Sequence, residues 1–81
     1  MRINVVAFAR VRELLGGNSH AIDLPPQSSA RDLWAALCER CPDLQPLAGS
    51  TRIARNGRIA PYDEPLEDGD EVALLPPVGG G

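Results

Sequence analysis

The chain ends in Pro76, Pro77 and Val78 followed by three glycines, and the carboxylate of Gly81 is its group most open to chemistry. Glycine is costly to order and packs poorly, so a run of three is an unusual end for a small domain. Backbone without Cβ atoms can enter a channel that excludes other residues. A carboxylate must be activated, usually as an acyl-adenylate, before a nucleophile attacks it. The tail therefore predicts chemistry on the chain's own C-terminus; a glycine run without function is the alternative.

Two cysteines and one histidine are the other candidates for reactive side chains. Cys38-Glu39-Arg40-Cys41 has the C-x-x-C spacing of redox and metal sites. The motif falls at the C-terminus of a predicted helix, where the dipole disfavours a thiolate, and His20 is the only histidine available as a zinc ligand. Both cysteines lie on the apolar face of that helix. We therefore interpret them as core residues and His20 as a strand residue, and we expect no metal site.

Length and composition limit the class of protein. A chain of 81 residues forms one domain. A net charge of −3 and an aromatic content limited to Phe8, Trp34 and Tyr62 argue against nucleic acid as a partner. The sequence has no apolar run long enough to span a membrane and no signal-peptide pattern. We therefore expect a cytoplasmic protein with reduced cysteines and no membrane partner.

The charges divide the chain into two parts. All eight basic residues are arginines at or before Arg58, whereas residues 59–81 hold six acids and no base. We expect this acidic part to be attracted to a basic partner surface or to form a solvated acidic turn. The chain has no lysine, so it offers no side-chain amine that could accept an isopeptide bond.

The first half of the chain is predicted to contain two strands and one main helix. Residues 3–9 and 19–24 have the pattern of antiparallel strands, with a short helical turn over 11–15 between them. Apolar residues then recur with helical spacing over 29–41, after a capping box and before a proline. Residues 43–50 are predicted to be an irregular connection.

The second half is predicted to contain a hairpin over 51–60, a tight turn over 67–70 and a last, buried strand over 71–75. A strand buried on both faces belongs in the middle of a sheet, and it would pair in parallel with the first strand across the helix crossover. The predicted fold is α+β: a ubiquitin-like β-grasp, with a mixed sheet of about five strands packed on one main helix. We expect this domain over 1–76 and an extended C-terminal tail over 77–81.

Three segments, in this order, resemble the small-subunit sulfur carriers of molybdopterin synthase, a MoaD-type family within the ubiquitin-like superfamily. F-A-R-V-R-E-L-L-G at Phe8–Gly16 is similar to the family's signature after the first strand. A-R-N-G at Ala54–Gly57 stands where the family has its hairpin. P-L-E-D-G-D-E-V-A-L-L-P-P-V-G-G-G at Pro65–Gly81 is similar to the most diagnostic stretch of the family, which ends in Gly-Gly. The match covers nearly the whole chain.

The resemblance implies a mechanism. An E1-like adenylyltransferase would adenylate the Gly81 carboxylate with ATP and magnesium, and a sulfur donor protein would supply the sulfur of a thiocarboxylate. Pro77, Val78, Gly79 and Gly80 would thread into the large subunit of molybdopterin synthase, within a heterotetramer. The sulfur would pass there to cyclic pyranopterin monophosphate and build the dithiolene of molybdopterin. The chain would bind no cofactor and would be a consumed co-substrate, with the catalytic groups on the large subunit.

The chain departs from the family at one position of the tail. Family members usually have Ser or Thr before the final pair, where this chain has Gly79. The change raises the entropic cost of threading but does not touch the reacting carbonyl.

Residues near the base of the tail are candidates for the partner interface. Either the core or an apolar patch beside the tail would contain Phe8, Leu75, Pro76 and Val78. Arg10 and Arg12 follow the first strand and would pair with the acidic turn or with carboxylates of a partner.

Three other functions remain open at this point. The chain could carry sulfur for another pathway, such as thiamine thiazole or cysteine synthesis. It could be a ubiquitin-like modifier that joins other proteins. It could also be a β-grasp binding module without tail chemistry, because fold alone does not determine function. In that case removal of Gly80 and Gly81 would leave its activity intact.

Overall fold

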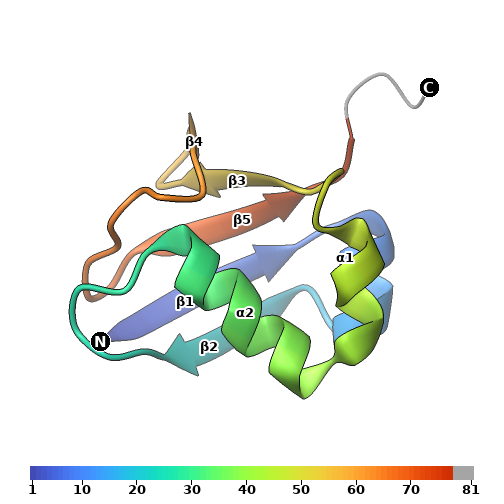
Figure 1. Cartoon of the computed structure of the whole chain (residues 1–81), viewed down its shortest axis with the longest axis horizontal. Helices are drawn as coiled ribbons and strands as arrows, with labels where there is room; N and C mark the ends of the chain where they lie inside the picture. Colours follow the sequence, from blue (N-terminus) through green and yellow to red (C-terminus); the bar gives the residue numbers. More distant parts are fainter. Residues whose placement is uncertain (78–81) are drawn as a thin grey trace.

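A five-stranded mixed sheet, in the order β2-β1-β5-β3-β4, curves around one helix in the computed structural model of the chain, which describes residues 1–77 (Figure 1). β1 and β5 run parallel, and the other neighbouring strands are antiparallel. This confirms the predicted α+β, ubiquitin-like β-grasp, with the last strand in the middle of the sheet. The elements are β1 (Arg2–Ala7), α1 (Ala9–Leu15), β2 (Ser19–Asp23), α2 (Ala30–Arg40), the 3₁₀ helix η1 (Pro42–Leu47), β3 (Arg52–Arg55), β4 (Arg58–Ala60) and β5 (Glu71–Leu75).

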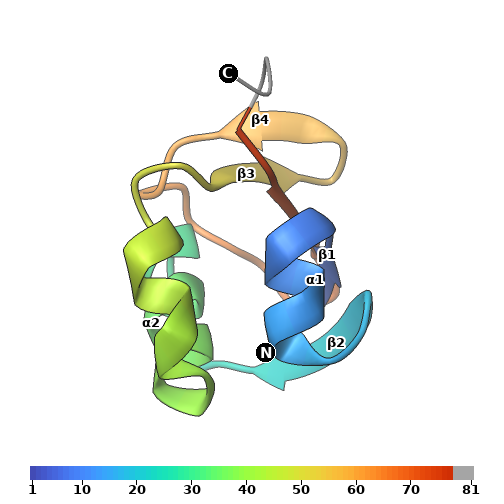
Figure 2. The same cartoon turned by 90° about the vertical axis from the view of Figure 1, so that its right-hand side faces the viewer.

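The hydrophobic core lies between the sheet and α2, which covers one side of it (Figure 2). Alternate residues of the central strands point into this core, because successive side chains of a strand face opposite ways. Apolar residues of α2 meet them at helical spacing. The largest fully buried side chains are Ile3, Val5, Ile22, Leu33, Leu37, Leu44, Ile53, Val72 and Leu74.

α2 begins at the predicted capping box. The Ser29 hydroxyl accepts a hydrogen bond from the Asp32 backbone N–H at 3.3 Å, and the Asp32 carboxylate accepts one from the Ser29 backbone N–H at 2.8 Å. These bonds satisfy donors that the first helical turn leaves without partners. The predicted tight turns are also confirmed, since Asn56, Gly57 and Gly69 have φ angles of +49°, +85° and +86°.

Two predicted elements differ from the structure. The first strand ends at Ala7 and not at residue 9, because Phe8 becomes the N-cap residue of α1 and Ala9 has a φ of +52°. The connection predicted to be irregular contains η1, which starts with Pro42 in the first turn, where the missing N–H of proline costs nothing. η1 forms because it buries Leu44 completely in the core.

Candidate functional site

The central position of β5 determines where the C-terminus leaves the domain. Leu74 pairs with β1 and with β3, and Leu75 pairs with β3, so the end of β5 is held from both sides. Pro76 and Pro77 follow and are exposed. They cannot donate backbone hydrogen bonds, so they end the pairing at the far end of the sheet from Met1 (Figure 1). The predicted tail residues Val78, Gly79, Gly80 and Gly81 lie outside the described residues.

A small apolar pocket of about 150 Å³ lies beside this exit. It exists because the parallel pairing of β1 with β5 brings the end of β1, and α1 after it, next to the end of β5. Phe8 is 44% exposed here, one of two large exposed hydrophobic residues among those described. The pocket is lined by Phe8, Ala9, Arg10, Val11, Leu47, Ser50, Thr51, Pro76 and Pro77.

The structure brings only part of the predicted interface together. Phe8, Arg10 and Pro76 line the exit pocket, whereas Leu75 is half-buried on the outer face of the sheet and Arg12 is exposed on α1. The Arg10 guanidinium pairs with the neighbouring carboxylate of Glu13 at 3.2 Å, one helical turn away. Within residues 1–77 neither arginine pairs with the acidic turn, so that predicted alternative is wrong.

An apolar row on the outer face of the sheet was missed by the sequence reasoning. Strand register places four side chains opposite one another across β1, β5, β3 and β4. Opposed residues of neighbouring strands share a face, and this face points away from α2. Ile59 lies at one end of the row and is 61% exposed. The apolar row consists of Val6, Ala73, Ala54 and Ile59.

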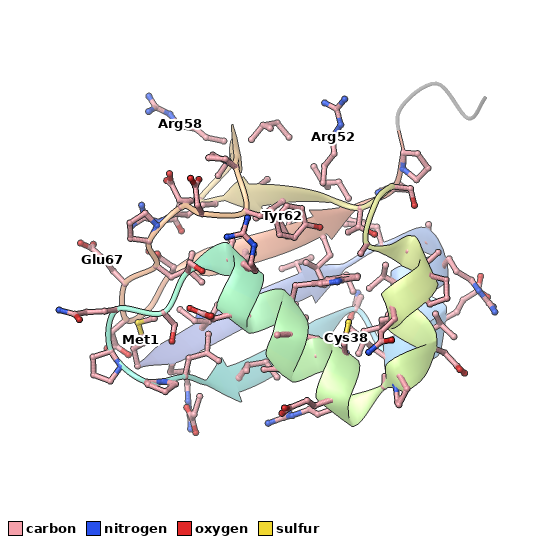
Figure 3. The ribbon with its side chains drawn as sticks, viewed as in Figure 1. Met1, Cys38, Arg52, Arg58, Tyr62 and Glu67 are labelled. Atoms are coloured by element: carbon pink, nitrogen blue, oxygen red, sulfur yellow. The ribbon has the colours of Figure 1, made fainter. Side chains whose placement is uncertain are left out.

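The outer face of the sheet is apolar near the C-terminal end of β5 and polar at the opposite end. The next position toward the C-terminal exit pairs Leu75 with Arg52, and Arg52 extends away from the domain (Figure 3). The positions at the opposite end of the sheet are polar and charged, because Asn4 lies opposite Glu71 and Arg2 opposite Asp23. The apolar part of the face is therefore the part next to the tail.

The acidic segment before β5 is partly balanced within the domain by one guanidinium. Asp70 is nearly buried, and its carboxylate accepts hydrogen bonds from the Glu67 N–H at 2.8 Å, Asn56 Nδ2 at 2.9 Å and Arg55 Nε at 2.7 Å. Burial acts to raise the pKa of Asp70, but these hydrogen bonds outweigh it and hold the pKa below its ordinary value. Three of the six acids thus face Arg55, which weakens the expectation that this part attracts a basic partner.

The cysteines are free thiols at the C-terminal end of α2, with Cys38 in its last turns and Cys41 as its C-cap. Cys38 is buried, and that burial raises the pKa of its thiol. Cys41 is half-buried and its Sγ donates a hydrogen bond to the Leu14 carbonyl at 3.5 Å. Among residues 1–77 no group of three or more His, Cys, Asp or Glu side chains could hold a metal ion. Helices in the same range are all too short or too polar to cross a membrane.

A β-grasp domain whose central last strand leads to an exposed C-terminal segment belongs to the ubiquitin-like class of proteins. The sequence profile of the ThiS family matches residues 5–81, and the chain therefore belongs to the ThiS family. The Escherichia coli K12 relative named "Molybdopterin synthase sulfur carrier subunit" is 42% identical, over 98% of this chain and 99% of that protein. A Chlamydomonas reinhardtii protein of the same name is 37% identical over the whole of both chains.

Solved structures agree with this assignment. A Pyrococcus furiosus protein described as a putative molybdopterin converting factor, subunit 1, superposes with a TM-score of 0.88, at 34% identity over 96% of this chain and 99% of that one. A Helicobacter pylori complex of subunits 1 and 2 of molybdopterin-converting factor contains a chain with a TM-score of 0.70 and 28% identity over both full lengths. Small archaeal modifier protein 1 of Haloferax volcanii has a TM-score of 0.85 and 28% identity over 95% of this chain and 98% of that one.

Proposed function

We propose that this chain is the sulfur carrier of molybdopterin synthesis, acting as the small subunit of molybdopterin synthase. The observation that carries the proposal is the full-length identity of 37% and 42% to two proteins of that name, in a chain that ends in three glycines. We place the protein in the cytoplasm, where its free thiols stay reduced.

The chemistry of the proposal takes place on the terminal carboxylate. The Gly81 carboxylate attacks the α-phosphorus of ATP on an E1-like enzyme with magnesium, which forms the acyl-adenylate and releases pyrophosphate. Sulfide delivered by a donor protein then attacks the acyl carbon and displaces AMP, leaving a thiocarboxylate. Its sulfur attacks cyclic pyranopterin monophosphate in the large subunit, and water then attacks the acyl carbon and cleaves the acyl–sulfur bond, so that the sulfur stays on the pterin and the carrier returns as a carboxylate. The carrier is thus a co-substrate that binds no cofactor of its own.

The surface around the tail supports a large protein partner. The exit pocket beside Phe8 and the apolar row ending at Ile59 lie on either side of the end of β5. Exposed apolar area of this kind is a common mark of a protein interface. In the proposal, the large subunit covers both surfaces while the tail threads into it, with two small subunits in a heterotetramer. The Helicobacter relative is described as a complex with a second subunit.

The proposed loading step is tested by intact mass. The full-length chain is incubated with ATP, magnesium, sulfide and the adenylating enzyme of molybdopterin synthesis, beside a variant that lacks Gly81. The expected result is a mass gain of one oxygen-to-sulfur exchange in the full-length chain alone. No gain, with an enzyme that loads the Escherichia coli carrier in parallel, would contradict the proposal.

A protein modifier is the second candidate function. It is favoured by the similarity to small archaeal modifier protein 1, at 28% identity and a TM-score of 0.85. A modifier would transfer its activated C-terminus to amines of other proteins, whereas a carrier would end as a free thiocarboxylate. Adding a lysine-rich acceptor protein to the loading reaction separates the two, because only a modifier would yield a covalent adduct.

A further inference from the structure

The β3–β4 hairpin is the part of the outer face with the least support from the fold. β4 has three residues, lies at the edge of the sheet and pairs only with β3 among the described strands. Ile59, the most exposed member of the apolar row, is the middle residue of β4. A short edge strand of this kind opens readily, so something else must set the position of Ile59.

One guanidinium joins the tip of this hairpin to the acidic turn and to the segment before that turn. Arg55 is the last residue of β3, and its side chain is 24% exposed. Its Nε donates to Asp70 Oδ2 at 2.7 Å and its Nη1 donates to Glu64 Oε2 at 3.2 Å. Its Nη2 lies 3.6 Å from Glu67 Oε2. We call Arg55, Glu64, Glu67 and Asp70 the Arg55 cluster. A planar guanidinium with several carboxylate partners fixes orientation as well as distance.

The residue after Arg55 strengthens the same connection. The Asn56 backbone N–H donates to the Glu71 carbonyl at 2.8 Å, and Asn56 Oδ1 accepts from the Glu71 N–H at 2.9 Å. Asn56 Nδ2 also donates to Asp70 Oδ1 at 2.9 Å. The tip of the hairpin is therefore tied to the start of β5, the strand whose other end leads to the tail.

We propose that Arg55 is a positioning residue, which holds the β3–β4 hairpin so that Ile59 stays in the apolar row and contacts the large subunit. This inference rests on the proposed function. The Arg55 cluster and Asn56 connect the hairpin to β5. The position of Ile59 is therefore fixed relative to β5, and so relative to Pro76, which follows β5. The large subunit then contacts Ile59 and the start of the tail at a fixed distance from each other. It does not lose binding free energy by ordering the hairpin.

A double-mutant cycle tests this role with the full-length chain and the molybdopterin synthase large subunit of the same organism. We expect Arg55→Leu and Ile59→Ala each to raise the Kd about tenfold, a loss that only a minority of interface residues produce on truncation. Arg55→Leu combined with Ile59→Ala should bind no more weakly than Ile59→Ala alone, because Arg55 acts through Ile59. Arg2→Leu is the matched control, because it removes an arginine–aspartate pair between two other strands and should leave the Kd unchanged.

Arg55→Leu leaves the nearly buried Asp70 without its arginine and could unfold the chain. The second variant, Arg55→Leu with Asp70→Asn, leaves no unpaired buried charge while it still releases the hairpin. In either folded variant, amide hydrogen exchange should rise in β4 and stay unchanged in β1 and β5. A merely stabilising role would instead raise exchange in all strands together.

Two results would overturn the inference. One is an unchanged Kd for the folded Arg55 variants, and the other is a weakening that adds to that of Ile59→Ala. If the wild-type chain neither gains sulfur nor binds the large subunit, the proposed function fails, and the inference about Arg55 fails with it. If the wild-type chain binds and the cycle is additive, only the inference fails.

Discussion

Ile53 and Ile59 are the same kind of residue in one hairpin, but they have opposite environments. Ile53 is 1% exposed in the core and Ile59 is 61% exposed on the outer face. The difference follows from the Asn56-Gly57 turn, whose two-residue loop sets Ala54 opposite Ile59 and Ala60 opposite Ile53. Because opposed residues share a face, the two isoleucines must point to opposite sides. The predicted turn therefore implies that Ile59 is exposed, although no prediction was made for Ile59 from the sequence.

The two isoleucines are expected to respond differently to truncation. Ile53→Ala should lower the free energy of unfolding by about 2–4 kcal/mol, because it leaves a cavity in the core. Ile59→Ala should change it by no more than about 0.5 kcal/mol, because the side chain is largely exposed. Urea denaturation of the isolated chain measures both. An Ile59→Ala loss as large as that of Ile53→Ala would show that Ile59 supports the core.

Asp70 is expected to make the stability of the domain sensitive to acid. Its pKa is lower in the folded chain than the ordinary value of 3.8, so its stabilising effect is fully present above that value. The effect is lost as the pH falls through the lower pKa of the folded state, because the unfolded chain then binds the proton more tightly. Asp70→Asn should therefore unfold more easily at neutral pH and lose less stability between neutral pH and pH values below 3.8. Urea midpoints across this range measure the difference, and parallel curves for the two proteins would contradict it.

At the scale of elements, local signals in the sequence predicted what depends on local chemistry. The capping box of α2 and the Asn56-Gly57 turn are present in the structure. The parallel pairing of the first and last strands is long-range, and it was predicted because both strands are strongly apolar and a helix crossover separates them. η1 was missed because its formation depends on burying Leu44 in the core, which no local pattern reveals. The partners of Arg55 were missed for the same reason, since Asp70 is 15 residues away in the sequence.

The capping box of α2 is expected to stabilise the whole domain, because α2 supplies one side of the core. Ser29→Ala removes the acceptor of the Asp32 N–H and should lower the free energy of unfolding by about 1 kcal/mol. Ser50→Ala is the control, since the exposed Ser50 hydroxyl donates one hydrogen bond to the Leu47 carbonyl and accepts none from the first turn of a helix. Thermal or urea denaturation compares the two. Equal effects of the two substitutions would contradict a role for the cap.

At the scale of the whole molecule, the fold places the exposed prolines after β5 next to the exit pocket and close to the apolar row. The tail was recognisable from sequence because it is a contiguous run of residues. The meeting of Phe8 with Pro76 followed from the predicted parallel pairing. The apolar row could not be assembled from sequence in the same way, because it takes one residue from each of four strands and depends on every register at once.

The most direct test of the central claim is transfer of sulfur from the loaded chain to its acceptor. The thiocarboxylated chain is mixed with the large subunit and cyclic pyranopterin monophosphate, and both molybdopterin and the intact mass of the chain are measured. The account predicts that molybdopterin forms while the chain returns to the mass of its carboxylate, and that a chain without Gly81 yields none. A loaded chain that binds the large subunit and keeps its sulfur would contradict the account.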